Sequence, residues 1–401
     1  MLLPILLRTL RRPMTLYAAL ALWCAALLFI VFASPNFRGT LADGASIPGG
    51  DYLQFFVAAK MVTGGVADQL YDFTLQQSIQ RDPALVPYTW DPRSYLLFVY
   101  PPFVAAFFVP WSLFPFMTSA ILWLLTMAAS GAVSLWCLVR EYSRLRPYFG
   151  GVLIAALIYR PFVHAIYSCQ NSTLSLLLFT GTFLLLRRER FYTAGCVAAL
   201  LSFKPQLLIV VGIAAILARA WRFVAGLISV GSLLGVCCLL VSVDATVAYL
   251  TRLPELSRWI EMPGMSLAGM SCWYGFFRLV LDGASLGAIQ LCTVLASAVT
   301  IGLVVARVRR FPLADEVSWS MVVIGTLLVS PHLLAYDLTL LLLPCALLVG
   351  SERLAHDLRG RWIAAALYLG AIVSPGLAKM VSWQPIVIVM FVALLLLRRA
   401  A

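Results

Sequence analysis

The sequence predicts an all-α protein that crosses a membrane many times, and two observations carry this prediction. Of the 401 residues, 62% are hydrophobic and only 11% are charged, whereas a soluble domain averages roughly 45–50% apolar and about 25% charged residues. The hydrophobic residues also form repeated runs that are separated by short, arginine-bearing connections. Composition and pattern together exclude a soluble globular protein, a disordered chain and a coiled coil.

The apolar runs are interpreted as helices of a single membrane-embedded domain that covers residues 1–401. The runs lie at 14–31, 97–115, 117–138, 148–165, 171–186, 191–203, 206–218, 223–243, 285–306, 317–330, 333–349, 361–374 and 383–397. Several are shorter than the ~20 residues that a perpendicular span needs, so we expect helical hairpins and broken helices. Prolines interrupt the run at 97–115, which is expected not to cross fully. About 12 transmembrane helices result, with both termini cytoplasmic.

Arginine clusters in the short connections give the expected orientation. Seven clusters hold 19 of the 29 basic residues: Arg8/Arg11/Arg12, Arg140/Arg144/Arg146, Arg187/Arg188/Arg190, Arg219/Arg222, Arg307/Arg309/Arg310, Arg353/Arg359/Arg361 and Arg398/Arg399. The positive-inside rule places all seven on the cytoplasmic side. The net charge of +12 therefore indicates membrane topology, and no nucleic-acid partner is expected.

Two long polar stretches, 35–94 and 244–283, then face the outer side. The first contains six aspartates and no glutamate. Loops of this length in a compact protein usually carry function. Within the first loop, Asp51 to Val62 has apolar residues at helical spacing. This pattern predicts an interfacial helix that lies on the membrane surface.

The outer ends of the predicted hairpins collect the remaining unusual polar residues. They are Arg160-Pro161 with His164, Gln170-Asn171, Lys204-Pro205-Gln206, Pro331-His332 and Tyr336-Asp337. Ionisable groups near membrane helices are costly and tend to mark a site, and proline-broken helices expose backbone donors that can hold anions. Because all of these residues fall on the side of Asp51, the sequence predicts one site there.

Asp51 follows Pro48-Gly49-Gly50 and opens the predicted interfacial helix. Aspartate is a preferred helix N-cap, so a purely structural role is one interpretation. The other is a general base, whose carboxylate takes a proton from an incoming hydroxyl. Only the second interpretation explains the polar residues expected around it.

Two basic residues, Lys204 and Arg160, are candidates for binding an anion. Lys204 is one of only three lysines in the chain and stands between two apolar runs. It is either a lysine that extends to the interface or a compact cation suited to phosphate. Arg160 alone fits an arginine that anchors a helix end at the membrane boundary. Together with Lys204 it could complete a site for an anionic lipid headgroup.

His332 and Asp337 allow similar alternatives. His332 is either a turn histidine with its hydrogen bonds satisfied or a proton or phosphate partner. Asp337 lies inside an apolar run, which is costly unless it pairs with a cation or with the His332 imidazole.

Several familiar motifs are missing from the sequence. It contains no Walker A sequence, no GxGxxG after a strand, no HExxH, no CxxC and no DxD pair, so an ATP-driven pump, a dinucleotide enzyme and a zinc protease lack their signatures. Neither a cofactor nor a metal is indicated. The donor of any reaction is therefore expected to be carried in the membrane.

Taken together, these motifs resemble glycosyltransferase family 87, a family of bacterial multi-pass proteins with the GT-C membrane fold that was formerly labelled DUF2029. The resembling elements are Gly49-Gly50-Asp51-Tyr52 with Phe55 and Ala58-Ala59, Tyr71-Asp72, Tyr100-Pro101-Pro102, Gln170-Asn171, Phe203-Lys204-Pro205-Gln206, and Ser330-Pro331-His332 with Tyr336-Asp337. Each triplet alone is a weak signal, but their order and spacing together are fairly specific.

The resemblance implies transfer of a sugar, typically mannose, from a polyprenyl-phosphate donor to a hydroxyl of a lipid or glycan acceptor. The reaction would occur on the outer face of the bacterial cytoplasmic membrane, among membrane lipids, as a single inverting displacement with Asp51 as base. The residues expected to bind donor phosphate or sugar are Lys204, Arg160, His332, Gln170, Asn171 and Gln206, with Asp337 and Tyr52 in support. The loop at 244–283 is a candidate for acceptor recognition, because the residues after Asp51 are mostly apolar.

Two other classes of protein remain as alternatives. A secondary transporter or lipid flippase also contains broken helices and buried charges, but such proteins usually have short loops and two similar halves, which this sequence does not show. A membrane scaffold without chemistry would leave the base, the lysine and the histidine on one face unexplained.

Overall fold

A computed structural model describes residues 9, 13–33, 49–86, 96–252, 267–354 and 357–398. Within these ranges the protein is helical, and its only β contact is an isolated antiparallel bridge between Met270 and Leu334. The arginines at 8, 11, 12 and 399 lie outside the described residues, as do the loop segments 35–48, 87–94 and 253–266. The fold class predicted from the sequence, all-α, is confirmed.

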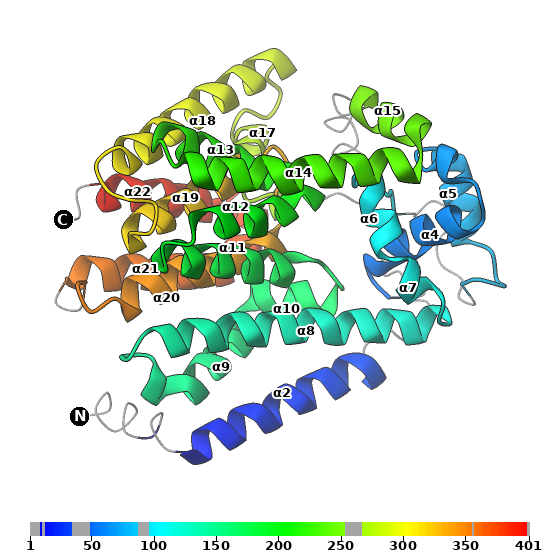
Figure 1. The fold of residues 1–401 in the computed structure, drawn as a ribbon. Coiled ribbons are helices and arrows are strands. Elements are labelled where there is room, and N and C mark those ends of the chain that lie inside the picture. Colours follow the sequence, from blue (N-terminus) through cyan, green and yellow to red (C-terminus); the bar gives the residue numbers. More distant parts are fainter. Residues whose placement is uncertain are drawn as a thin grey trace.

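Figure 1 shows the helices coloured along the chain. The α-helices are α2 (Pro13–Ala33), α4 (Tyr52–Thr63), α5 (Phe73–Gln80), α6 (Pro102–Phe107), α7 (Val109–Ser112), α8 (Phe116–Glu141), α9 (Phe149–Ile158), α10 (Arg160–Tyr167), α11 (Ser172–Arg187), α12 (Phe191–Ala199), α13 (Leu208–Leu217), α14 (Trp221–Val241), α15 (Val243–Arg252), α17 (Trp273–Val280), α18 (Leu286–Val308), α19 (Glu316–Val329), α20 (Leu342–Gly350), α21 (Leu358–Val381) and α22 (Pro385–Leu397). The 3₁₀ helices are η1 (Ala67–Gln69), η2 (Arg146–Tyr148), η3 (Leu200–Phe203), η4 (Pro205–Leu207), η6 (Leu267–Gly269) and η7 (Ala335–Leu341).

Four described helices, α8, α14, α18 and α21, are long and apolar enough to cross a membrane. A fifth span arises if η2, α9 and α10, which meet at a 69° bend, are counted together. Further apolar helices of 10–17 residues, among them α11 and α19, match the short runs in the sequence. The protein is therefore a multi-pass membrane protein. The run at 97–115 forms the short helices α6 and α7, neither of which can cross alone.

Prolines produce the breaks that the short runs predict. Pro161 lies in the first turn of α10, and Tyr159 before that helix is extended (φ −74°, ψ 96°). Lys204 precedes Pro205 and is likewise pulled out of the helix (φ −126°, ψ 77°), which separates η3 from η4. Proline has no amide hydrogen with which to continue a preceding helix, and it disfavours helical backbone at the residue before it, which is Lys204 in the case of Pro205. Two chain breaks consequently bring polar residues to the ends of apolar helices.

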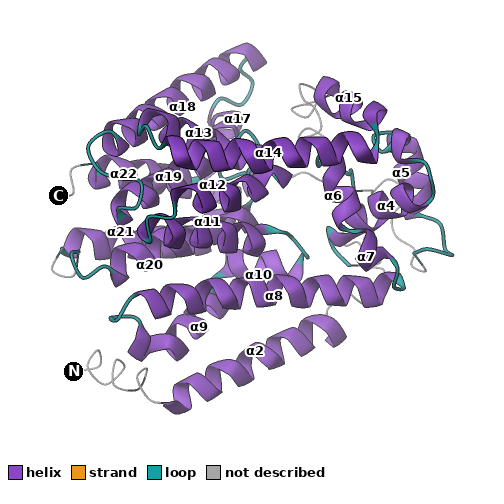
Figure 2. Cartoon of the chain, viewed as in Figure 1, coloured by secondary structure: helices purple, strands orange, loops and turns teal. Residues whose placement is uncertain are grey.

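The described helices of the first long loop and α15 of the second form one layer with α6 and α7, whereas α17 of the second loop packs against α18. Helices α4, α5, α6, α7 and α15 gather at the right of Figure 1, while the C-terminal end of α8 and the N-terminal end of α14 lie at the left. Figure 2 shows that short loops join most helices of the chain. Arg252, at the end of α15, donates a hydrogen bond to the Tyr71 carbonyl and lies 5.7 Å from the centre of the Phe73 ring. This contact connects the second loop to the first.

Helix α4 forms where the sequence predicts it, but it is enclosed by protein. Its residues from Tyr52 to Ala59 are all buried, and α6, α7 and α8 pack around it. Phe55 stacks on Phe108 with ring centres 4.5 Å apart, and Phe108 meets Trp123 at 4.6 Å. Apolar side chains occupy every face of α4 and are buried by protein, so the helix does not present an open apolar face to the membrane surface. Its position relative to the bilayer stays a prediction.

Two glycines allow α12 and α14 to pack with their backbones in close contact. A β-carbon on Gly195 would lie 2.0 Å from the Phe223 carbonyl oxygen, and one on Gly226 would lie 2.0 Å from that of Tyr192. Small residues at helix interfaces allow such an approach in membrane proteins. This pair fixes α12, and with it the chain that leads into Lys204.

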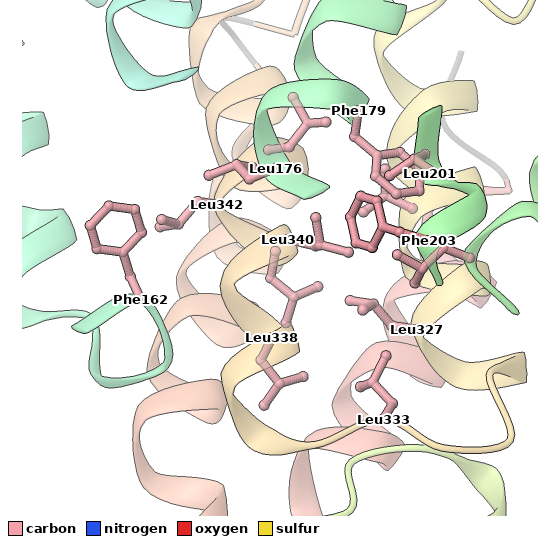
Figure 3. Close-up of a cluster of buried hydrophobic side chains, with 14 of the residues drawn as sticks. Phe162, Leu176, Phe179, Leu201, Phe203, Leu327, Leu333, Leu338, Leu340 and Leu342 are labelled. Carbon is pink, nitrogen blue, oxygen red and sulfur yellow. The ribbon is translucent and has the colours of Figure 1, made fainter. Parts of the chain in front are cut away.

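An apolar core lies between α10, α11, η3, α19, η7 and α20. Figure 3 shows side chains from these elements turned toward one another, and the labelled residues are buried. The group comprises Phe162, Leu176, Phe179, Leu201, Phe203, Leu327, Leu333, Leu338, Leu340 and Leu342. Because η7 contributes Leu338 and Leu340, the core fixes the segment that carries Asp337.

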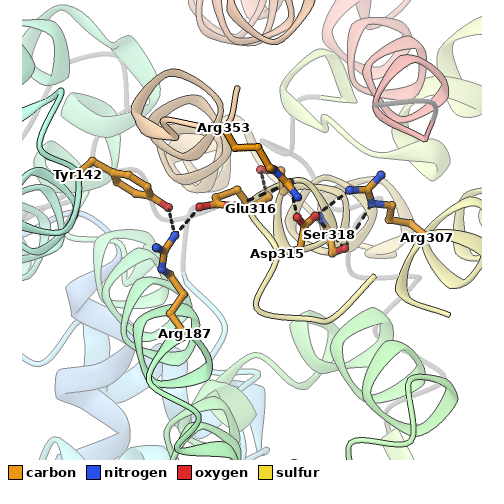
Figure 4. Close-up of polar contacts among 8 residues, drawn as sticks. Tyr142, Arg187, Arg307, Asp315, Glu316, Ser318 and Arg353 are labelled. Carbon is orange, nitrogen blue, oxygen red and sulfur yellow. Dashed lines mark hydrogen bonds and ion pairs between the residues drawn. The ribbon is translucent and has the colours of Figure 1, made fainter. Parts of the chain in front are cut away.

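Ion pairs join the helix ends that carry arginine clusters (Figure 4). Arg307 is buried and bonds Asp315 at 2.9 Å, and Arg353 bonds the same carboxylate. Arg187 contacts Glu316 and also donates to the Tyr142 hydroxyl at 3.2 Å. Members of four predicted clusters thus lie at one end of the molecule, since Arg144 bonds the Ser351 carbonyl there as well.

Candidate active site

A strained turn between α10 and α11 holds the predicted base. Cys169 adopts a left-handed backbone (φ 54°), which is uncommon for a residue other than glycine. The Ser168 carbonyl accepts a hydrogen bond from the Asp51 amide at 3.0 Å, and the Cys169 carbonyl accepts one from Trp123 Nε1 at 3.0 Å. The turn thereby connects Asp51 to α8 and α10.

Gly50 makes the close approach to this turn possible. Its φ is +55°, and a β-carbon at this position would lie 2.8 Å from the Ser168 carbonyl oxygen. Gly49 before it also has a positive φ, of +70°. Glycine adopts this backbone without the steric penalty that a β-carbon brings. The Gly49-Gly50 pair is thus required by the geometry that delivers Asp51.

The Asp51 carboxylate points at Gln170 and does not cap its own helix. Gln170 Nε2 donates to Asp51 Oδ2. Asp51 is the N-cap residue of α4, yet its side chain accepts no hydrogen bond from the helix backbone. Its other oxygen, Oδ1, bonds none of the described residues and can accept a proton. The geometry therefore does not support the capping interpretation.

Burial raises the pKa of Asp51 to about 7. The positive charge of Lys204 acts in the opposite direction, and the negative charge of Asp337 adds to the rise. A carboxylate that titrates near neutral pH is suited to general base catalysis, because it is both available and basic enough to take a proton.

Lys204 and Asp337 form a buried ion pair beside Asp51. Lys204 Nζ lies 2.8 Å from Asp337 Oδ1, which also accepts a hydrogen bond from Ser172 Oγ at 2.6 Å. Both charged residues are at most 7% exposed. The prediction that Asp337 needs a cation is confirmed, and the cation is Lys204. A lysine has three donors, so two remain for other partners.

His332 lies in the same electrostatic environment. Burial lowers the pKa of its imidazole; Asp337 opposes this shift and Lys204 adds to it. The imidazole is therefore neutral at pH 7. Its Nδ1 atom is buried and has no hydrogen-bond partner. The interpretation as a turn histidine with its hydrogen bonds satisfied is not supported by this geometry.

Two tyrosines belong to the cluster: Tyr336, which the sequence placed among the polar residues at the outer hairpin ends, and Tyr100, which it did not single out as a site residue. Burial beside Asp51 and Asp337 raises the pKa of Tyr100, and a hydrogen bond with Asn171 acts in the opposite direction. The Tyr336 ring centre is 5.4 Å from Lys204 Nζ. Both residues occur in the motifs quoted above, Tyr-Pro-Pro and Tyr-Asp, which was the available signal.

Unpaired polar atoms surround the cluster. Gln170 Oε1 and Asn171 Oδ1 are buried without a hydrogen-bond partner, like His332 Nδ1. Buried polar groups in folded proteins are almost always paired. Three such atoms from residues around Asp51 are suited to hydrogen bonds with a bound molecule.

Three predicted residues are not part of this contact network. Tyr52 is fully buried, and its hydroxyl bonds Ser119 inside the aromatic packing around α4. Gln206 is half-buried and its side chain bonds none of the described residues. Arg160 is exposed and lines a separate cavity with Lys379.

The second long loop reaches the edge of the cluster. Met270 pairs with Leu334 in the isolated bridge, and the Ser271 amide donates to the Leu333 carbonyl at 2.9 Å. The Gln384 side chain holds the same segment through the Leu267 carbonyl at 2.9 Å. The segment 267–271 is therefore fixed beside the chain that carries His332 and Asp337.

The fold and this cluster define a multi-pass membrane protein. Its candidate site has a carboxylate, Asp51, whose pKa is raised to about 7, beside a buried cation, Lys204. The sequence model of glycosyltransferase family 87 matches residues 98–331, more than half of the chain. The chain belongs to glycosyltransferase family 87, as its motifs indicated, and is a glycosyltransferase of the membrane. No curated protein and no solved structure matches it. Gln170, Asn171 and Lys204 fall within the matched residues, whereas Asp51 and Asp337 lie outside them.

Proposed function

We propose that the protein transfers a sugar, which we take to be mannose, from a polyprenyl-phosphate donor to a hydroxyl of a lipid or glycan acceptor. The site would face the outer side of the bacterial cytoplasmic membrane in a GT-C-type fold of about 12 spans. The long helices, the bent pair and the seven shorter apolar segments provide twelve candidates for these spans. The ion-paired arginine end lies away from the loop layer, which favours the same orientation.

The observation that carries the proposal is the environment of Asp51. One carboxylate oxygen is held by Gln170, the other bonds no described residue, and the pKa is raised to about 7. Such a carboxylate is oriented, accessible to a proton and basic enough to accept one. Family membership supplies the type of reaction.

In the proposed step, Asp51 Oδ1 takes the proton of the acceptor hydroxyl as its oxygen attacks the anomeric carbon. A bond forms between the acceptor oxygen and that carbon, while the bond from the carbon to the donor phosphate oxygen breaks. The lipid phosphate leaves with the electron pair, and the configuration is inverted. The base acts as in inverting glycoside hydrolysis, but an anionic leaving group needs charge neutralisation more than a proton.

Lys204 and His332 are proposed to stabilise the departing phosphate. Lys204 retains two donors after bonding Asp337, and a neutral His332 can donate one hydrogen bond. Fixed donors aimed at developing negative charge lower the barrier in a buried site. Gln170 and Asn171 are proposed to bond sugar hydroxyls through their unpaired oxygens. Gln206, in the turn that follows Lys204, is proposed to bond the sugar as well. Asp337 positions Lys204.

The test is transfer of labelled mannose from polyprenyl-phosphate mannose in membranes that contain Asp51→Asn. General bases contribute about 10²–10⁴-fold, so we expect a loss of that size with unchanged expression and thermal stability. Asp68→Asn, an exposed aspartate of the same loop, is the matched control and should transfer normally. A folded Asp51→Asn protein with the wild-type rate would remove the base assignment.

Orientation is tested separately by cysteine labelling. A cysteine at Ser78 should react with an impermeant reagent added from outside, whereas one at Arg144 should react only after permeabilisation. Labelling of the Arg144→Cys protein in intact cells, above the background of the parent chain, would contradict the proposed sidedness.

A further inference from the structure

A cavity of about 150 Å³ lies where α10, η7 and α21 meet. Arg160 and His164 line it from α10, Ala335 from η7, and Pro375 and Lys379 from α21. This cavity brings two of the chain's isolated cations together although they are far apart in the sequence. One of them, Lys379, has no part in the proposed transfer reaction.

The lining of the cavity has positive charge without a compensating acid. No aspartate or glutamate contributes to it, and neither Arg160 nor Lys379 forms an ion pair with any residue in the described part of the chain. Like charges that share a cavity repel each other. An anion in the cavity would relieve that repulsion and could bond the guanidinium, the ammonium and the imidazole.

The cavity neighbours the Asp51 cluster but is electrostatically distinct from it. Tyr336 separates the two, with its ring centre 5.8 Å from the His164 ring and 5.4 Å from Lys204 Nζ. Lys204 already has a carboxylate partner in Asp337. The positive charges without a carboxylate partner are therefore those of Arg160 and Lys379 in the cavity.

Exposed apolar side chains flank the two cations. Ile158 precedes Arg160 and is 63% exposed, while Met380 follows Lys379 and is 81% exposed. Lys379 also lies near the end of α21, one of the membrane-capable helices. A ligand that reaches this cavity with an apolar part against these side chains and a charge between the cations has the chemistry of an anionic lipid.

We propose that this cavity binds the phosphate of a lipid headgroup, as an anion subsite formed by Arg160, His164 and Lys379. The phosphate could belong to a polyprenyl phosphate or to a glycerophospholipid, and the chemistry of recognition is shared. Binding at this subsite does not require Asp51. A failure of the transferase proposal would therefore leave it intact.

Binding is measured by native mass spectrometry of the purified protein in detergent. Farnesyl phosphate and dioctanoyl phosphatidylglycerol are the two phosphate probes. Farnesol and dioctanoylglycerol are their uncharged counterparts. The test variant is Arg160→Gln with Lys379→Gln. The control is Arg309→Gln with Arg310→Gln, which removes two exposed charges elsewhere.

The test variant should bind at least one phosphate probe about tenfold or more weakly, since each charge-assisted hydrogen bond that is lost weakens binding by about a factor of ten or more. The control should bind like wild type, and Lys379→Arg should retain affinity. Selective loss of farnesyl phosphate binding assigns the subsite to polyprenyl phosphate, and selective loss of phosphatidylglycerol binding assigns it to phospholipid. Unchanged affinity for both, or an equal loss for the uncharged probes, would overturn the proposal.

Discussion

Lys204 and Asp337, 133 residues apart in the chain, form an ion pair of 2.8 Å beneath Asp51. The pair joins the break between η3 and η4 to the 3₁₀ helix η7, and Ser172 adds a third contact from α11. Because each charge neutralises the other, the site contains a fixed dipole beside the Asp51 carboxylate. This arrangement leads to predictions for both stability and activity.

Lys204→Met should destabilise the protein, because it leaves the Asp337 carboxylate buried without a partner. Breaking one side of a buried ion pair typically costs about 3–5 kcal/mol, which should lower the unfolding temperature in detergent. The double variant Lys204→Met, Asp337→Leu should recover much of that loss, since no isolated charge remains. Both variants should lack transferase activity. A double variant as unstable as the single one would show that the pair itself contributes net stability.

The pH dependence of kcat/KM should report Asp51. A general base works when deprotonated, so activity should rise with pH through a midpoint of about 7, the raised pKa of the free carboxylate. The measurement is initial-rate transfer between pH 5 and 9 in detergent. An activity that is flat across this range would contradict the assignment.

Gln170→Leu refines the same measurement. Loss of the amide donor removes a hydrogen bond that favours the charged carboxylate, so the midpoint should move to higher pH. Gln290→Leu, an exposed position on α18, makes the same chemical change and should leave the midpoint where it is.

Gly50→Ala should reduce transfer through strain at the Asp51 turn. The alanine β-carbon would meet the Ser168 carbonyl oxygen at 2.8 Å, and the backbone has φ +55°. Left-handed backbone costs a residue with a β-carbon about 1–2 kcal/mol, and relief of the contact should displace Asp51. Gly65→Ala is a matched control, with φ +75° and open space around the β-carbon. It should lose a similar amount of stability from strain while kcat is retained.

Arg307→Met should destabilise the opposite end of the bundle. It leaves Asp315 with Arg353 as its remaining ion-pair partner among the described residues, and a loss of up to about 3–5 kcal/mol is expected. Arg309→Met removes an exposed arginine two residues away and should have little effect. Equal unfolding temperatures of the two variants would indicate that the buried pair contributes little.

Much of the fold could be predicted from the sequence because the membrane imposes strong rules on composition. The apolar runs gave the helices, and prolines such as Pro161 and Pro205 gave the breaks. The environment of α4 could not be predicted in this way. Its apolar spacing fits a membrane surface and a protein interior equally, and the rings that enclose it come from segments more than 50 residues away, such as Phe108 and Trp123.

The site was predictable at the level of residue type and less so at the level of contacts. Asp51, Lys204 and Asp337 stood out because charged residues are rare among apolar runs. Arg160 follows the 69° bend between α9 and α10 and lines a cavity that Lys204 does not reach, and periodicity does not give such an angle. Tyr100 was missed as a site residue because an aromatic residue beside a membrane loop fits an interfacial belt equally well.

Helix α11 begins beside the Asp51 cluster and ends at the ion-paired arginines, so its length relates the candidate active site to the bilayer. Its 16 residues rise only about 24 Å, less than the ~30 Å of a typical hydrocarbon core. A bilayer with one interface at Arg187 therefore extends beyond Asn171. The cluster then lies below the level of the lipid headgroups, and in the proposed reaction the acceptor hydroxyl has to reach this depth to meet the donor.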